Sequence, residues 1–146
     1  MPRIYSNYET MKKGKRVKVV FPIEYRLLVT PVYKEREKQI VTLFGLRTIN
    51  EFSNFHYEII VEPDITDKTI RLDIRGLRAP QVTIPGSGPA VFRQEFPDLH
   101  GTYNLIVRKL DKQENSFTIS ITNERITVKD SPADHFIDVV TNPEEW

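Results

Sequence analysis

Apolar and polar residues alternate in short stretches along most of this chain, and turn-forming residues separate the stretches. Residues 55–62 alternate except at Ile60, and residues 70–75 repeat the pattern after a turn at Asp67-Lys68. An alternation with a period of two places successive side chains on opposite faces of a β-strand. Because no segment longer than about ten residues has a helical period, the pattern predicts an all-β protein.

The segments that read as strands follow one another at intervals of about 8–12 residues, which is typical of a β-sandwich or a small barrel. They are residues 17–21, 25–32, 39–46, 55–61, 70–75, 82–84, 91–96, 103–108, 117–122, 126–128 and 136–140. We expect an antiparallel β-sandwich, with a small closed β-barrel as the alternative.

Three segments carry more specific signals. Pro31 predicts an edge or a bent strand, because proline cannot donate to a strand ladder. Residues 39–46 are almost continuously apolar, which indicates a strand that is buried on both faces. Residues 47–54 show no clear strand pattern and are compatible with a single helical turn.

Charged residues on two adjacent segments are placed to pair across strands. Glu58 and Glu62 occupy the polar face of one segment, and Arg71 and Arg75 occupy the polar face of the next. If the two strands pair antiparallel, these carboxylates and guanidinium groups share one outer face, where each pair contributes roughly 0.2–1 kcal/mol. We interpret them as structural contacts.

Length and composition are those of one soluble domain. The chain has 146 residues, of which 39% are hydrophobic and 28% are charged, so it can form a core without metal or disulfide cross-links. We divide it into a polar lead-in (1–13), a β-domain (14–141) and a C-terminal tail (142–146). It contains no cysteine, which excludes disulfides and thiolate chemistry. Without an apolar run of about 18 residues or a signal peptide, we expect a cytoplasmic, bacterial protein with no transmembrane segment.

Positive charge is concentrated near the N-terminus. Residues 1–50 carry eleven Lys and Arg against four Asp and Glu, although the whole chain has a net charge of only +1. Much of the excess lies in one short segment, the basic segment, whose cations are Lys12, Lys13, Lys15, Arg16 and Lys18. Such a cluster could contact a membrane surface or a nucleic acid. A solvated edge strand explains it better, because edge lysines prevent strands of different molecules from pairing.

One motif carries a family resemblance. Residues 97–105, Pro-Asp-Leu-His-Gly-Thr-Tyr-Asn-Leu, resemble the corner before the penultimate strand of immunoglobulin-like and fibronectin type III-like sandwiches. The resemblance implies an immunoglobulin-like sandwich in which Tyr103, two residues after Gly101, hydrogen-bonds back across the corner loop. It covers about ten residues and implies no functional residue. The cysteine–tryptophan core signature of immunoglobulin domains is absent from this chain.

No motif predicts catalysis, a metal or a cofactor. His56, His100 and His135 lie far apart in the sequence, and no spacing brings several ligands together as a metal site requires. The loop at residues 85–89, Pro-Gly-Ser-Gly-Pro, lacks the Lys-Ser/Thr pair and the following helix of a phosphate-binding loop. We therefore expect no catalytic, metal or cofactor residues.

The remaining hypothesis is a non-catalytic protein-interaction or accessory module. A barrel that carries a small apolar ligand is the alternative, and an anionic partner held by the basic segment is a weaker one. We expect the partner to be another protein or a second copy of the chain. Trp146 is the only tryptophan and ends the sequence. Because tryptophan is favoured as an interface anchor, we predict that Trp146 docks in an apolar groove on a partner-facing surface.

Overall fold

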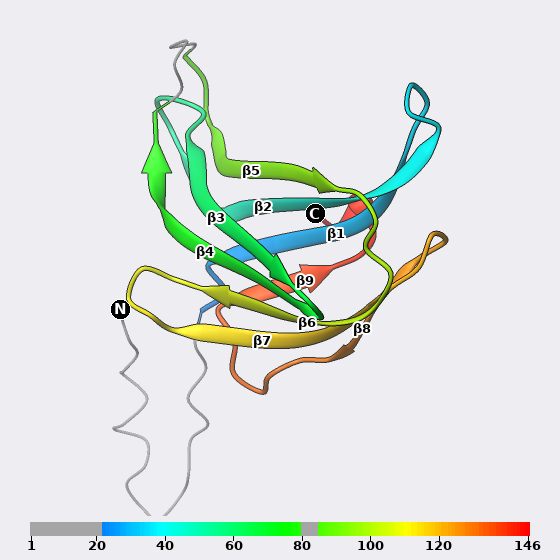
Figure 1. Ribbon diagram of the computed structural model, residues 1–146. Coiled ribbons are helices and arrows are strands. Elements are labelled where there is room, and N and C mark those ends of the chain that lie inside the picture. Colours follow the sequence, from blue (N-terminus) through cyan, green and yellow to red (C-terminus); the bar gives the residue numbers. More distant parts are fainter. Residues whose placement is uncertain (1–21, 80–84) are drawn as a thin grey trace, which may run out of the picture.

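Nine β-strands follow one another in the computed structural model, which describes residues 22–79 and 85–146 (Figure 1). The strands are β1 (Tyr25–Lys34), β2 (Gln39–Phe52), β3 (Glu58–Thr66), β4 (Thr69–Arg78), β5 (Gly88–Phe96), β6 (Gly101–Arg108), β7 (Glu114–Ile121), β8 (Ile126–Asp130) and β9 (Ile137–Val140). A short 3-10 helix, η2 (Pro143–Glu145), follows β9. The fold is all-β, as the alternation of apolar and polar residues predicted.

All nine strands belong to one sheet, in the order β8-β7-β6-β4-β3-β5-β2-β1-β9. Five of the eight pairings are antiparallel, but β1–β9, β3–β5 and β4–β6 are parallel. The sheet is therefore mixed, and the prediction of a purely antiparallel arrangement is wrong. Two of the parallel pairs arise where strands that follow each other in the sequence are not neighbours in the sheet. β5 lies between β2 and β3, and the next strand, β6, pairs with β4.

The sheet curls until its two edge strands, β8 and β9, approach each other, so that it is nearly closed into a barrel (Figure 1). A sandwich of two separate sheets is not confirmed, because backbone pairing runs without a break from β8 to β9. The junction between β3 and β5 is nevertheless narrow. A single residue pair, Glu58 with Val91, joins them, and the N–H of Val91 donates to the carbonyl of Tyr57 at 3.2 Å.

The hydrophobic core fills the inside of the curled sheet. It is one continuous cluster to which every strand contributes, and the side chains with 0% exposure include Leu27, Val29, Phe44, Leu46, Ile70, Leu72, Leu105, Val107, Ile119 and Ile137. These positions alternate along their strands with less buried ones, as on a sheet with one face turned to the core. Burial at roughly 25 cal/mol per Å² makes this cluster the main stabilising contribution.

Two strands extend further than the sequence pattern indicated. β2 continues through residues 47–52, which showed no clear strand pattern and were compatible with a helical turn, because Glu51 and Phe52 pair with the start of β5. β3 continues past Pro63, although proline usually ends a strand. Pro63 is tolerated because β4 pairs with it on one side, while β5 meets β3 only at Glu58. The predicted strands at residues 17–21 and 82–84 lie outside the described residues.

Candidate functional site: the seam between β8 and β9

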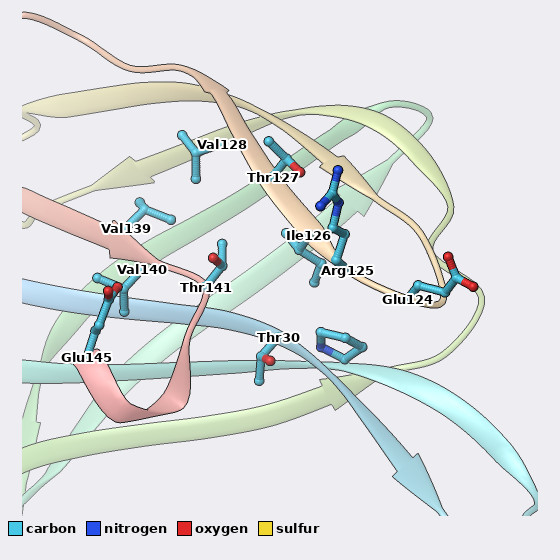
Figure 2. A pocket seen from close by; sticks show the side chains of 11 residues that line it. Thr30, Glu124, Arg125, Ile126, Thr127, Val128, Val139, Val140, Thr141 and Glu145 are labelled. Carbon is cyan, nitrogen blue, oxygen red and sulfur yellow. The ribbon is translucent and has the colours of Figure 1, made fainter.

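The two edges of the sheet face each other across an open cleft, which we call the seam cleft (Figure 2). Its volume is about 580 Å³, within the range of roughly 300–1,000 Å³ that is usual for binding clefts. The residues that line it are Thr30, Pro31, Glu124, Arg125, Ile126, Thr127, Val128, Val139, Val140, Thr141 and Glu145.

The strands on either side of the seam cleft run in opposite directions but do not pair in the described part of the chain. β9 is parallel to β1, and following the pairings across the sheet from β1 to β8 gives β8 the opposite direction. The loop of residues 131–136 joins them as it would join a hairpin, yet each strand pairs on its other side, β8 with β7 and β9 with β1. Both therefore present backbone N–H and C=O groups to the cleft that no strand of the described chain pairs with.

The chain is anchored at the end of the seam where this loop enters β9, which we call the closed end. The carbonyl of Phe136 accepts hydrogen bonds from the N–H of Glu24 at 2.7 Å and of Tyr25 at 3.2 Å. The buried side chain of Asn115 accepts from the N–H of Phe136 at 2.9 Å. Lys109 Nζ lies 2.7 Å from the carboxylate of Glu24 and 4.7 Å from the ring centre of Phe136. These contacts anchor Phe136, the residue before β9, to the start of β1 and to β7, and the seam cleft lies toward the other end of β9.

The lining of the seam cleft combines an apolar floor with a polar rim. Figure 2 shows Val128 and Val139 on opposite sides of the cleft, and both pack against the hydrophobic core. Thr127 and Glu124 are exposed at the rim. Among the residues that the structure describes, the lining contains no histidine and no pair of acidic residues on facing strands. Its chemistry suits an extended polypeptide, which offers backbone groups to the edges and alternating side chains to the floor and the rim.

Trp146 lies on the outer face of the sheet, where it contacts residues of β1, β2 and β5. The indole Nε1 donates to the carbonyl of Arg26 at 3.3 Å, and Arg47 Nη1 donates to Trp146 O at 3.2 Å. The guanidinium carbon of Arg93 lies 5.0 Å from the ring centre. A Cβ atom at Gly45 would lie 3.5 Å from Trp146 Cζ2. The side chain is half-buried against its own sheet, and its role toward a partner stays a prediction.

Tyr103 and Gly101 lie at the start of β6. Tyr103 is buried, and its phenolic oxygen accepts a hydrogen bond from the N–H of His100 at 3.1 Å. Gly101 has a φ of +109°, which favours glycine because it avoids a Cβ clash. Lys68 Nζ donates to the carbonyl of His100 at 3.2 Å and lies 5.0 Å from the ring centre of Tyr103. The three contacts fix the chain where it turns into β6.

The other predicted contact residues are not brought into the seam by any described feature. Lys12, Lys13, Lys15, Arg16 and Lys18 lie outside the described residues. His56, His100 and His135 lie on different segments, and within residues 22–79 and 85–146 no three acidic or histidine side chains gather as a metal site would require. His135 instead contacts Asp138, with Nε2 3.2 Å from the carboxylate.

A second cleft of about 520 Å³ lies where β3 and β5 diverge. Its polar groups include His56, Glu58, Arg78 and Arg93, and its floor includes Ile59.

Arg78 contacts the Glu58 carboxylate at 2.8 Å, and a similar contact of 2.8 Å joins Arg75 to Glu62. Of the expected cross-strand pairs, Glu62 with Arg75 is confirmed, whereas Glu58 pairs with Arg78 and Arg71 pairs with Glu114. Exposed pairs of this kind contribute roughly 0–1 kcal/mol.

The seam residues could not have been found from the sequence. Val128 and Val139 look like ordinary strand residues, and only the order of strands shows that they face each other across a cleft.

The described chain contains no helix long and apolar enough to span a membrane. No protein-family model matches the sequence, and comparison with curated proteins and with solved structures likewise finds no match.

Proposed function

We propose that this chain is a non-catalytic protein-interaction module that binds an extended segment of a partner protein in the seam cleft. One observation carries the proposal: two strand edges face each other across an open cleft, and no strand of the described chain occupies it. Unpaired edges attract extended chains, and strand addition is a common mode of peptide recognition. Main-chain hydrogen bonds would supply affinity, and alternate side chains would supply specificity.

The lining indicates what the guest segment should look like. Residues that point inward would meet Ile126, Val128 and Val139, so they should be apolar and β-branched. Residues that point outward would meet threonines and the carboxylates of Glu124 and Glu145, and Arg125 is the single cation among the described lining residues. The guest should therefore alternate apolar and polar residues and carry positive charge near its ends.

The barrel-carrier alternative finds less support. A carrier needs an internal space for its ligand, whereas the inside of this curled sheet is occupied by one cluster of packed side chains. The weaker alternative, an anionic partner, rests on the basic segment alone. If that alternative holds, replacement of all five cations by serine should abolish binding to anionic vesicles or nucleic acid, and salt should weaken it by screening.

Titration with a synthetic peptide tests the proposed function. The probe is a capped peptide of alternating valine and threonine with a lysine at each end, and binding is followed by calorimetry or by anisotropy of a fluorophore on the peptide. We expect saturable 1:1 binding. The matched control replaces two threonines by proline, which removes backbone donors while the chain remains extended.

Three results would contradict the proposal. They are the absence of binding, equal binding of the proline control, and self-association of the protein that excludes the peptide. The last result would assign the seam to a second copy of the chain, and sedimentation of the protein alone would reveal it.

A further inference from the structure

The two edges of the seam differ in how well they are protected against pairing. β8 contains a β-bulge, because Thr118 and Ile119 on β7 pair with Asp130 and Val128, which leaves Lys129 as the extra residue. Both Lys129 and Asp130 are exposed. Bulges and charged side chains are the usual means by which proteins prevent an edge from accepting another strand.

β9 lacks this protection. Its four residues pair with β1 without a register shift, and its only charged residue, Asp138, contacts His135. Val139 and Val140, at the open end, are half-buried and line the seam cleft. Alternate residues of a strand direct their backbone groups to opposite sides, so part of the β9 backbone faces away from β1 and into the cleft.

The two ends of β9 are held by different contacts. At the closed end, Phe136 and Ile137 are buried and the carbonyl of Phe136 is hydrogen-bonded. At the open end, Val140 pairs with Leu28, and the chain then leaves the sheet. Within the described part of the chain, the open end is held by its pairing with β1, by the core packing of Val139 and by the residues that follow β9.

Those residues are Thr141 and the C-terminal tail (142–146), which connects the seam to the far side of β1. Thr141 and Glu145 line the seam cleft. Asn142 caps η2, accepting hydrogen bonds from Glu144 N at 3.0 Å through its side chain and from Glu145 N at 2.9 Å through its carbonyl. Trp146 then contacts β1, β2 and β5 through the groups described above. The tail thus spans the distance between the cleft and a fixed site on the sheet.

From these contacts we propose that the partner segment adds to the free edge of β9, and that Trp146 is the positioning residue that holds this edge in place. The inference rests on the proposed function, because it assigns the guest strand to one of the two edges. Binding is stronger when the receiving edge is already ordered, since less conformational freedom is lost on association. Release of Trp146 should therefore weaken binding without removing any lining side chain of the cleft.

Hydrogen exchange of backbone amides, read residue by residue, tests which edge receives the guest. The probe is the capped valine–threonine peptide with terminal lysines. We expect it to slow exchange within residues 137–140 and to leave the cleft-facing amides of residues 126–130 unchanged. Protection of β8 alone would overturn the choice of β9 and leave the proposed function standing. Protection of neither edge would contradict the proposed function itself.

The role of Trp146 is tested on the protein without any peptide. In Trp146→Ala, exchange at Val139 and Val140 should accelerate, while exchange at Ile137 should stay as in the parent chain. Gly45→Val should act in the same way from the other side of the contact, because the indole already touches the position of a Cβ. Leu110→Ala, which truncates an exposed apolar side chain, is the matched control and should change neither.

The same variants are then titrated with the peptide. We expect Trp146→Ala and Gly45→Val to bind it about three- to tenfold more weakly than the parent chain, and Leu110→Ala to bind it equally well. Unchanged exchange at Val139 and Val140 would overturn the positioning role. Tighter binding by Trp146→Ala would overturn it too, because the tail would then compete with the guest.

Discussion

The phenolic oxygen of Tyr103 accepts a hydrogen bond from the backbone N–H of His100, three residues earlier in the chain, at 3.1 Å. The bond spans the corner at Gly101, where the chain enters β6. Because Tyr103 is only 5% exposed, water cannot easily replace the phenol as the acceptor. The Tyr103 side chain therefore supplies one buried contact to the corner, and that contact can be removed with little change in the shape of the residue.

Tyr103→Phe should lower the free energy of unfolding by roughly 1–2 kcal/mol, because the N–H of His100 loses its partner. Chemical denaturation followed by circular dichroism measures the change. Tyr33→Phe is the control. Because Tyr33 is 58% exposed, water can hydrogen-bond to the groups around its hydroxyl, and the free energy of unfolding should stay close to that of the parent chain. Equal midpoints for Tyr103→Phe and the parent chain would show that the bond contributes nothing.

Asn115→Ala should destabilise the closed end of the seam. The Asn115 side chain accepts from Phe136 N at 2.9 Å and donates to the carbonyls of Glu114 and Asp134 at 3.1 and 3.3 Å. Its removal leaves the buried N–H of Phe136 without a partner, at a cost of roughly 1–3 kcal/mol. The exposed Asn104 provides the control variant Asn104→Ala, which should stay within about 0.5 kcal/mol of the parent chain. A loss of equal size in both variants would contradict the structural role of Asn115.

The fluorescence of Trp146 should report a half-buried indole, since it is the only tryptophan in the chain. We expect an emission maximum to the blue of free tryptophan and partial protection from iodide. In Gly45→Val the emission should shift toward that of free tryptophan, because valine occupies the space beneath the ring. Emission that resembles free tryptophan in the parent chain would show that the indole is not docked.

Tyr25 should make stability fall at alkaline pH. Burial raises the pKa of Tyr25 above its ordinary value of 10.0, and the carboxylates of Glu24 and Asp111 raise it further. The unfolded chain then releases the phenolic proton more readily than the folded chain, so stability is complete below about pH 10 and declines as pH rises above it. Denaturation midpoints at pH 8 and pH 10.5 should differ more for the parent chain than for Tyr25→Phe. An equal decline in the two proteins would exclude this residue as the cause.

Which residues form strands was largely encoded in the local sequence. Alternation placed Ile70, Leu72 and Ile74 on one face, and all three are buried. Local pattern failed where pairing overrode it. Residues 47–52 extend β2 because β5 lies alongside. Pro63 stays within β3 because most of this strand has a hydrogen-bonding neighbour, β4, on one side only.

The alternation of apolar residues and the turn signals were sufficient to determine an all-β chain with an apolar core, and the lack of cysteine excluded disulfides. They could not decide between a sandwich and a barrel, because a period of two says which side chains share a face but not which strands are neighbours. The order of the strands depends on contacts between residues far apart in the chain, and it alone made β8 and β9 the edges. The same contacts placed Gly45, Arg26 and Arg93 around Trp146. The sequence could single out this tryptophan, but only the tertiary structure created the surface on which it lies.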